Sequence, residues 1–424
     1  MLETTYLREL RDDAVARLNK RNIDAAGLIA RAVELDSARR STQQSLDTEQ
    51  AELNNLSRSI GELMKAGKKD EADAARAKTT ELKANVSRLQ DELNANETAL
   101  RDHLCQIPNV PNAKVPAGKT PEDNVTVMQE GAMPSLPDTA KPHWELGEEY
   151  GLLHMDLGVK LTGAGFPVYS GQGAKLQRAL ISFFLDRAIA AGYREIIPPH
   201  MVNADSAFAT GQLPDKEGQM YHATADNLYL IPTAEVPITN LYRDEIIDVD
   251  RLPIKNVGYT PCFRREAGSY GAHVRGLNRV HQFDKVEIVR IEKPENSYAA
   301  LDQMVEHVKG LLRDLELPYR QLLLCGGDMG FSSAMTYDME VYAGAQKRWL
   351  EVSSISCFET YQSNRLKLRY KGEDKKTRLL HTLNGSALAL ARIVAALLEN
   401  NQTAEGIRIP KALQAYTGFD MIRK

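Results

Sequence analysis

Two neighbouring segments of the chain carry the side chains best suited to chemistry. Residues 259–266 are predicted to form a strand with Arg264 and Glu266 on one face, because side chains alternate between the two faces of a strand. A loop containing three glycines separates this strand from a second alternating run, residues 280–289. The second run places four side chains on one face: His281, Phe283, Lys285 and Glu287.

This pair of strands has two interpretations. An ordinary hairpin with a salt bridge at its surface is the simpler one. However, an aromatic ring and a carboxylate beside arginines make a poor core, because buried charges are costly unless they are paired. The same groups suit a nucleotide, whose phosphates need cations and whose base needs an aromatic surface. We therefore interpret the hairpin as a nucleotide-binding site.

These residues resemble motif 2 of the class II aminoacyl-tRNA synthetases, and in particular of the seryl-tRNA synthetase family. The resemblance rests on Phe263-Arg264-Arg265-Glu266, on the loop that ends at Arg279, and on His281-Gln282-Phe283. Four further segments resemble landmarks of the same family: residues 211–214 (GQLP), 233–237 (TAEVP), 351–354 (EVSS) and 384–392 (NGSALALAR). Together with a long helical segment near the N-terminus, they cover nearly the whole chain in the order typical of that family.

The resemblance implies an α+β fold. It consists of an N-terminal antiparallel α-helical coiled-coil arm and a class II synthetase domain, in which helices flank an antiparallel β-sheet. A homodimer is also implied, formed partly by the helix, strand and proline element that ends near Pro199. The implied activity is that of a serine–tRNA ligase. ATP activates L-serine as seryl-adenylate, and serine is then transferred to tRNA(Ser); tRNA(Sec) is a second candidate acceptor.

The resemblance also implies roles in binding ATP. Arg264 is expected to clamp the α-phosphate and the serine carboxylate while negative charge builds in the transition state. Glu266 is expected to accept a hydrogen bond from the adenine amino group, and Phe283 to stack beneath the ring. Arg392 would cover the other face of the ring and reach the γ-phosphate together with Arg279. Arg264 and Arg392 are the expected catalytic residues, and four more complete the expected ATP site: Arg265, Val280, Val352 and Ser353.

Magnesium binds hard oxygen ligands and keeps several of its waters, so one carboxylate and one hydroxyl can hold it. In the family pattern these ligands correspond to Glu351 and Ser354, which are three residues apart and also belong to the expected ATP site. An isolated E-x-x-S pattern has no such specificity. The expected Mg²⁺ site therefore depends on the resemblance.

Serine presents a small hydroxyl and an ammonium group, which an apolar pocket cannot recognise. Buried hydrogen-bonding groups that alanine or glycine would leave unpaired impose a penalty on those amino acids. The resemblance places six residues at the expected serine site: Thr233, Ala234, Glu235, Glu287, Asn384 and Ser386.

Three features depart from the pattern of the family. Arg265 stands where a serine is common, and Cys357 stands where an asparagine is common. The loop of residues 269–275, which the resemblance places at the acceptor end of tRNA, has an unusual Ala-His-Val centre. Transfer to tRNA is therefore less directly indicated than adenylation.

Residues 28–104 are predicted to form the helical arm. They contain no proline and no aromatic residue, and residues with high helix propensity dominate. Gly67 and the acidic residues from Asp70 onward indicate a turn between two antiparallel helices. Two interleaved seven-residue series mark the second helix as part of a coiled coil: Thr79, Val86, Leu93 and Leu100, with Ala75, Leu82, Leu89 and Asn96.

The charge near the tip of this arm has two explanations. Between residues 57 and 88, eight basic side chains outnumber five acidic ones. A solvated helix surface and an arm that follows the phosphates of a folded RNA both explain this excess. The resemblance favours the arm as the tRNA-binding part of the protein.

The composition limits the classes of function. The chain has 424 residues, 43% of them hydrophobic, which predicts two or three folded regions. Its 53 basic and 57 acidic residues give a net charge of −4, which excludes nucleic-acid binding by bulk positive charge. The four cysteines form no C-x-x-C pair, so a reduced, cytoplasmic protein is expected. No run of about 18 apolar residues predicts a membrane span.

We expect three regions: residues 1–107 as a tRNA-binding domain with the arm, residues 108–143 as a proline-rich linker, and residues 144–424 as the catalytic domain. Two alternative functions stay open. A ligase that loads an amino acid onto a carrier protein would share the catalytic sheet but lack the arm. An inactive coiled-coil scaffold would have no need of the arginines and carboxylates of the nucleotide site.

Overall fold

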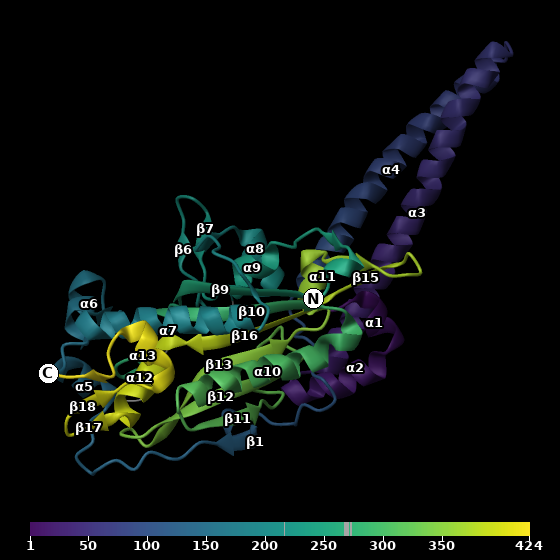
Figure 1. Ribbon diagram of the computed structural model, residues 1–424. Helices are drawn as coiled ribbons and strands as arrows, with labels where there is room; N and C mark the ends of the chain where they lie inside the picture. The colour runs from purple at the N-terminus through teal and green to yellow at the C-terminus, as the bar shows by residue number, and fades with distance from the viewer. Residues whose placement is uncertain (216, 267–270, 272–273) are drawn as a thin grey trace. The chain divides into compact units, whose positions relative to one another are not determined.

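The computed structural model describes residues 1–215, 217–266, 271 and 274–424 (Figure 1). The chain divides into two compact units. Met1–Asn19 and Ile23–Pro108 form the first unit, and Lys20–Asn22 with Asn109–Lys424 form the second. Among the described residues, none of the helices has the length and apolar character that a membrane span requires.

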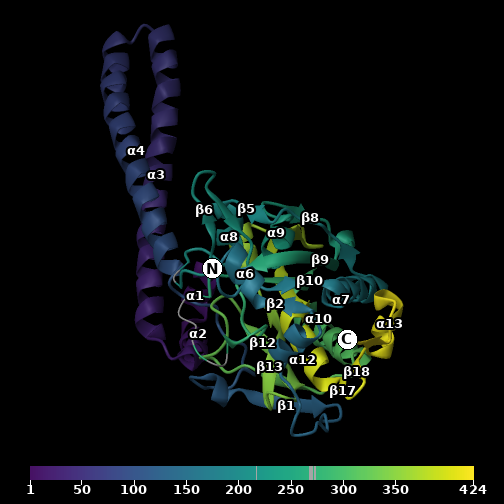
Figure 2. The ribbon, with the colours of Figure 1, turned by 90° about the vertical axis from the view of Figure 1, so that its left-hand side faces the viewer.

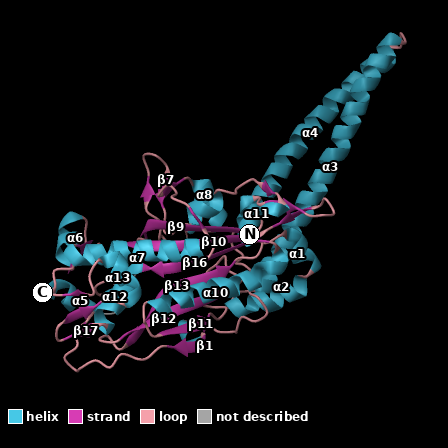
Figure 3. Ribbon diagram, in the orientation of Figure 1, coloured by secondary structure: helices cyan, strands magenta, loops and turns pink. Residues whose placement is uncertain are grey.

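Long helices dominate the first unit (Figure 3). Two short helices, α1 (Thr4–Glu9) and α2 (Arg11–Leu18), precede α3 (Ala25–Lys65) and α4 (Lys69–Leu104). The Asp24 side chain caps α3 by accepting a hydrogen bond from the backbone N–H of Gly27. Gly67 adopts a φ of +74° in the turn between the long helices, and Asp70 and Glu71 lie in the first turn of α4. The predicted pair of helices with a turn at Gly67 is confirmed.

The two long helices lie side by side, as the views in Figures 1 and 2 show. The buried side chains of α4 include most of the two predicted series: Ala75, Thr79, Leu82, Leu89, Leu93 and Leu100. Asn96, which was also expected at a core position, donates a hydrogen bond from Nδ2 to Oγ1 of Thr42 in α3 at 3.1 Å. Thr42 in turn donates to Glu92 at 3.2 Å. A polar pair at a core position favours one register between the helices.

An eight-stranded sheet forms the centre of the second unit. In spatial order its strands are β1 (Val125–Glu130), β11 (Tyr319–Leu323), β12 (Met335–Ala343), β13 (Arg348–Cys357), β16 (His381–Ala389), β10 (Gln282–Glu292), β9 (Ile254–Phe263) and β4 (Arg194–Glu195). Neighbouring strands are antiparallel, except that β4 is parallel to β9. Strand β1 lies within the segment predicted as a linker and adds an edge to the sheet. The predicted α+β class with an antiparallel sheet is confirmed.

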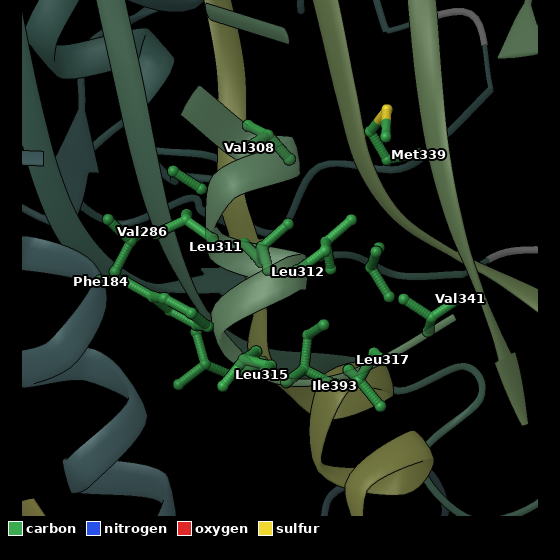
Figure 4. Close-up of a cluster of buried hydrophobic side chains, with 14 of the residues drawn as sticks. Phe184, Val286, Val308, Leu311, Leu312, Leu315, Leu317, Met339, Val341 and Ile393 are labelled. Atoms are coloured by element: carbon green, nitrogen blue, oxygen red, sulfur yellow. The ribbon is translucent and has the colours of Figure 1, made fainter. Parts of the chain in front are cut away.

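One face of this sheet carries the main apolar core. Helices α7 (Gly171–Ala190), α10 (Ser297–Asp314) and α12 (Leu390–Asn400) pack against it. Figure 4 shows part of this core, where Leu311 and Leu312 of α10 lie near Val286 of β10, Val341 of β12 and Ile393 of α12. Burial of these side chains removes apolar surface from water and stabilises the sheet in this position.

The opposite face of the sheet, called here the site face, carries polar side chains. Glu287 lies between the core residues Val286 and Ile288, so strand alternation points its side chain to the site face. Ser386 of β16 stands opposite Glu287 in the register of the two strands. Two shorter helices lie on this face. Helix α9 (Glu235–Asn240) contacts β10, and α11 (Tyr361–Leu366) contacts β16. Helix α8 (Ala204–Thr210) packs against both of these helices.

The remaining elements surround this frame. They are α5 (His143–Glu149), α6 (Met155–Leu161) and α13 (Lys411–Thr417), with the short strands β2 (Leu153–His154), β3 (Val168–Tyr169), β5 (Met201–Val202), β6 (His222–Ala223), β7 (Leu228–Leu230), β8 (Ile246–Ile247), β14 (Arg369–Lys371), β15 (Thr377–Leu379), β17 (Gln402–Thr403), β18 (Gly406–Arg408) and β19 (Met421–Ile422). These strands form small sheets of two or three strands.

Candidate active site

The hairpin of β9 and β10 positions Arg264. The backbone N–H of Arg264 donates to the carbonyl of His281 at 2.9 Å, and the His281 ring donates from Nδ1 back to the Arg264 carbonyl at 3.1 Å. The guanidinium lies over the ring of Phe283, with its central carbon 5.3 Å from the ring centroid, and Nε donates to the Pro232 carbonyl at 3.4 Å. The strand pairing and the aromatic ring thus hold this cation at the end of the hairpin.

The predicted strand through Glu266 is wrong in its last three residues. Strand β9 ends at Phe263, and Glu266 adopts a φ of +48°, so the two-residue alternation does not reach it. The Glu266 carboxylate pairs with Nε of Arg279, which brings the two ends of the intervening loop together. The Arg265 side chain is exposed. Most of the predicted acceptor loop, residues 269–275, lies outside the described residues.

Arg392 joins three elements of the site. It extends from α12, and its Nε donates to the carbonyl of Asn278 at 2.8 Å. Its Nη1 donates to the carbonyl of Glu351 in β13 at 2.7 Å and lies 3.7 Å from the Glu351 carboxylate. Arg392 therefore lies between the residues that lead into β10 and the predicted metal ligand Glu351.

A buried polar group supports the segment that carries Asn278 and Arg279. His143 and Glu399 are fully buried, and Nδ1 of His143 lies 2.8 Å from a Glu399 oxygen. The backbone N–H of Leu277 donates to Nε2 of His143 at 2.8 Å, so the ring proton is on Nδ1 and is donated to Glu399. Gln346 donates to Glu399 and accepts a hydrogen bond from the Asn278 amide, both at 2.7 Å. These bonds fix the backbone that supplies the Asn278 carbonyl to Arg392.

The predicted metal ligands, Glu351 and Ser354, both belong to β13, which pairs with β12. Ser354 stands opposite Asp338, and the Ser354 side chain hydrogen-bonds to the Asp338 carboxyl. Burial, with a further contribution from the charge of Glu351, raises the pKa of Asp338 well above its ordinary value. Within the part of the chain that the structure describes, Oδ1 of Asp338 is buried and has no hydrogen-bond partner. Such a set of hard oxygens, one of them unsatisfied, fits Mg²⁺.

The predicted serine-binding carboxylates are buried close together on the site face. Glu287 forms an ion pair with Lys285 at 2.6 Å, and Oγ of Ser386 donates to Glu287 at 3.3 Å. Glu235 begins α9, where its backbone N–H donates to Oγ1 of Thr233 at 3.3 Å. The pKa of Glu235 is raised to about 7, mainly because the carboxyl is buried and secondly because of the charge of Glu287. We call these residues the amino-acid cluster: Thr233, Glu235, Lys285, Glu287 and Ser386.

The charged groups around Phe283 form a second set. We call it the nucleotide cluster: Arg264, Glu266, Arg279, Phe283, Glu351, Ser354 and Arg392. Arg264 belongs to this cluster, yet its charge also acts on Glu235 of the amino-acid cluster. The site therefore offers cations and an aromatic ring beside a set of buried hydrogen-bonding groups.

Comparisons with known proteins identify this arrangement. Residues 1–111 match the family model described as the seryl-tRNA synthetase N-terminal domain, and residues 220–401 match the tRNA synthetase class II core domain (G, H, P, S and T). The serine–tRNA ligase of Salinibacter ruber is 49% identical over 407 residues, which are 96% of this chain and 95% of that protein. The chain belongs to the seryl-tRNA synthetase family.

Further members of the seryl-tRNA synthetase family match this chain over its full length. The serine–tRNA ligase of Chlorobium phaeovibrioides is 44% identical over 100% of this chain and 99% of that protein. The crystal structure of seryl-tRNA synthetase from Pyrococcus horikoshii complexed with ATP matches with a TM-score of 0.92 at 32% identity. That match covers 100% of this chain and 99% of the other. The predicted activity of a serine–tRNA ligase is confirmed, and these findings support neither a carrier-protein ligase nor an inactive scaffold.

Some residues expected from the synthetase family pattern turn their side chains away from the clusters. Val280 and Val352 belong to the apolar core on the other face of the sheet, so only their main chain is available to a ligand. Ala234 is buried among apolar neighbours, and Ser353 donates its hydroxyl to the Ser386 carbonyl at 2.6 Å. Asn384, by contrast, is buried in β16 two residues before Ser386, so strand alternation puts it on the site face. Cys357, at the position where this family commonly has asparagine, is buried in the core.

Four side chains in or near the clusters were not assigned to the site from the sequence: Lys285, Asp338, Gln362 and Thr382. Lys285 shares a face with Glu287 in the alternating run, so its sequence position carried a signal. Asp338 alternates with apolar residues in β12, which indicates only a half-buried strand. Gln362 and Thr382 reach the site through tertiary contacts, and nothing in their spacing in the sequence indicates this.

Proposed function

We propose that the chain binds L-serine at the amino-acid cluster and ATP with Mg²⁺ at the nucleotide cluster, and that it acts on tRNA(Ser) as a homodimer. The observation that carries the proposal is the position of Arg264. Its guanidinium lies against Phe283, and its Nε donates to the carbonyl of Pro232, the residue before Thr233 of the amino-acid cluster. A cation between the two clusters is where the carboxylate of serine and the α-phosphate of ATP would meet.

The first chemical step needs this cation. A carboxylate oxygen of serine attacks the α-phosphorus of ATP, a new P–O bond forms, and the bond to the bridging oxygen breaks as pyrophosphate leaves. Two anions must approach each other, and negative charge grows on the α-phosphate oxygens. Arg264, already oriented by Phe283 and the Pro232 carbonyl, would stabilise that charge without reorganising. In the second step a terminal ribose hydroxyl of tRNA attacks the carbonyl carbon, gives up its proton, and AMP leaves.

Glu351 and Ser354 are the side chains that would hold Mg²⁺, with Asp338 beside them. When bound, the ion would neutralise phosphate charge and help to orient the triphosphate. Arg279 and Arg392 are the cations available to the outer phosphates. Both are already close to carboxylates, Glu266 and Glu351, so binding of the triphosphate would rearrange existing ion pairs.

Recognition of serine would depend on buried, oriented hydrogen-bonding groups. The Glu287 carboxylate is held by Lys285 and Ser386, and Glu235 lies near enough for the two carboxylates to repel each other. An ammonium group between them would relieve that repulsion. An amino acid without the hydroxyl would leave a buried polar group unpaired, which costs about 1 to 3 kcal/mol.

The arm is the proposed contact for tRNA. All eight basic side chains between residues 57 and 88 are exposed on α3, α4 and their turn. Replacing Arg58, Lys65, Lys69 and Lys83 by glutamine should raise the KM for tRNA(Ser) at least about tenfold, because phosphate contacts depend on charge. Serine-dependent pyrophosphate exchange should not change. Replacing Glu62 and Glu81 by glutamine is the matched control, and an unchanged KM for tRNA in the basic variant would contradict the role of the arm.

The dimer would use apolar side chains near the element predicted for it. Ile197, which follows β4, is 84% exposed, and Ile189 of α7 and Met201 of β5 are also exposed. Large apolar side chains that are exposed in the monomer are candidates for burial in an interface. Ile197→Asp should shift the mass measured by light scattering from that of a dimer to that of a monomer. The control is Leu10→Asp, also at an exposed position, and a wild-type monomer would contradict the proposal.

The decisive experiment is pyrophosphate exchange across the twenty amino acids. The expected result is exchange that depends on serine, on ATP and on Mg²⁺. Exchange that depends on a different amino acid would overturn the assignment of the amino-acid cluster. Complete absence of exchange in a folded protein would overturn the proposed reaction.

A further inference from the structure

We propose that Gln362 and Thr382 are positioning residues for the amino acid substrate, because they hold the Glu235 carboxylate in one orientation. The inference rests on the proposed binding of serine at the amino-acid cluster. Neither residue belongs to that cluster, and neither is expected to touch ATP.

The contacts form a short chain of hydrogen bonds. The Thr382 hydroxyl donates to Oε1 of Gln362 at 2.7 Å. Nε2 of Gln362 donates to Oε1 of Glu235 at 2.6 Å and to the Thr210 carbonyl at 3.1 Å. Thr382, Gln362 and Thr210 are each 1% exposed, and Glu235 is 8% exposed. Water therefore cannot easily take the place of any of these bonds.

The chemistry of the partners determines which group donates and which accepts in this series of hydrogen bonds. A side-chain amide has an oxygen that only accepts and a nitrogen that only donates. Turning the Gln362 amide over would point its oxygen at the Thr210 carbonyl and at the Glu235 carboxylate, which are both acceptors. The amide is therefore locked with its N–H groups toward Glu235, and the Thr382 hydroxyl supports this orientation.

The consequence for Glu235 is that its two oxygens have different environments. Within the described residues, Gln362 is the side chain that hydrogen-bonds to this carboxylate, and it does so at Oε1. The second oxygen, Oε2, is left for a ligand. Burial raises the pKa of Glu235 to about 7, and the bond from Gln362 acts in the opposite direction because it stabilises the ionised form. An ionised and oriented carboxylate suits the ammonium or hydroxyl of an amino acid.

The network also couples the elements of the site face. Glu235 begins α9, Gln362 belongs to α11, and Thr210 ends α8. Thr382 lies in β16, the strand that carries Ser386 of the amino-acid cluster. The distance from Glu235 to the groups on the sheet is therefore set partly by Gln362. Small displacements of such groups have large effects on binding and rate.

The test compares variants that remove one bond and keep the volume. Gln362→Met removes the amide, and Thr382→Val removes the hydroxyl. In serine-dependent pyrophosphate exchange, Gln362→Met should raise the KM for serine about tenfold or more, with kcat and the KM for ATP within about threefold of wild type. Thr382→Val should change the KM for serine in the same direction by a smaller factor. Thr382→Ser should restore it, because the hydroxyl returns.

Two controls separate this role from a general effect on folding. Gln321→Met replaces another buried glutamine, in β11 and outside both clusters, and should leave the KM for serine unchanged. The double variant of Gln362 and Thr382 should cost less than the product of the two single effects, because both act through one carboxylate. If Gln362→Met does not fold, the Thr382→Val and Thr382→Ser pair provides the test.

The outcomes are distinct. A folded Gln362→Met variant with a KM for serine within threefold of wild type would overturn the inference. Equal increases in the KM for serine and for ATP, or a loss of kcat alone, would show a merely structural role and would also overturn it. Failure of the proposed function looks different, because the wild-type protein itself would then show no serine-dependent exchange.

Discussion

The amino-acid cluster and the nucleotide cluster hold their charges in opposite ways. In the amino-acid cluster, the side chains of Glu287 and Lys285 are 2% and 6% exposed and bind each other. In the nucleotide cluster, Arg279 and Glu351 are 42% and 49% exposed. The charged groups of the first cluster pair with each other in the interior, whereas part of the charge of the second cluster is exposed to solvent.

This difference matches the two ligands that we propose. A small amino acid offers few groups, so discrimination needs buried partners that are costly to leave unpaired. A triphosphate carries several charges and can displace ion pairs that contribute little at an exposed site. We therefore expect changes in the amino-acid cluster to alter stability and the KM for serine, and changes in the nucleotide cluster to alter the KM for ATP. Arg264, whose charge acts on both, should be the exception.

Arg264→Ala should have the largest effect. The variant should lower the kcat of pyrophosphate exchange by about a hundredfold to a thousandfold, because one oriented donor to the growing charge is lost. Arg251→Ala, at an exposed position in the second unit, is the matched control. A rate within about tenfold of wild type, or ~1.4 kcal/mol of transition-state stabilisation, would show that the clusters do not meet at Arg264.

Glu287→Gln should have the next largest effect, because Lys285 would remain buried without its counter-charge. Breaking a buried ion pair costs about 3 to 5 kcal/mol. We expect a loss of that size in the free energy of unfolding measured with urea, together with a large increase in the KM for serine. Glu266→Gln removes one partner of the Glu266–Arg279 pair, whose arginine is 42% exposed, and serves as the comparison. Similar losses of stability in the two variants would remove the distinction between the clusters.

Much of this arrangement could be predicted from the sequence, because local patterns carry it. Strand alternation in residues 280–289 put Phe283, Lys285 and Glu287 on one face, and the structure confirms that Lys285 and Glu287 meet. The heptad positions of α4 likewise predicted its buried side chains. In both cases neighbouring residues of one element determine which face is covered.

The remaining features depend on contacts between distant segments. Alternation failed at Glu266, because the chain leaves the strand after Phe263 and Glu266 turns into a left-handed conformation to meet Arg279. Gln362 lies 127 positions from Glu235 and gives no local signal of their hydrogen bond. The unpartnered oxygen of Asp338 is likewise a property of the assembled strands. The contacts of such groups can be identified only in the folded structure, because they depend on how the sheet and the helices pack.

A change of pH should alter the KM for serine by less than Glu287→Gln does and by more than the smallest effect that we expect. The pKa of Glu235, about 7, lies above its ordinary value of 4.5, so the folded protein without ligand favours the protonated form. The contribution of Glu235 to the free energy of unfolding is therefore fully present below pH 4.5 and is lost as the pH rises through about 7. The ammonium of serine favours the ionised form. The KM for serine should therefore rise by up to about tenfold per pH unit as the pH falls below 7.

The KM for ATP should not follow this curve, since Glu235 is outside the nucleotide cluster. The side chain introduced by Glu235→Gln cannot ionise. The KM of this variant for serine should be higher than that of wild type at neutral pH. It should also be nearly constant between pH 5.5 and 7.5, an interval of roughly two units around the wild-type pKa. The measurement is initial-rate pyrophosphate exchange at each pH. An equal pH dependence in wild type and in Glu235→Gln would exclude Glu235 as the titrating group.

Arg279→Ala should show the smallest effect. The side chain is exposed and its ion pair with Glu266 is open to solvent on one side, so the free energy of unfolding should change by less than about 1 kcal/mol. Loss of one cation near the outer phosphates should raise the KM for ATP about threefold to tenfold, with the KM for serine unchanged. Exchange assays with ATP and serine varied in turn would measure both. An equal change in the two KM values would mean that the loop ends joined by this pair also position the amino-acid cluster, and the proposed independence of the two clusters would then be wrong.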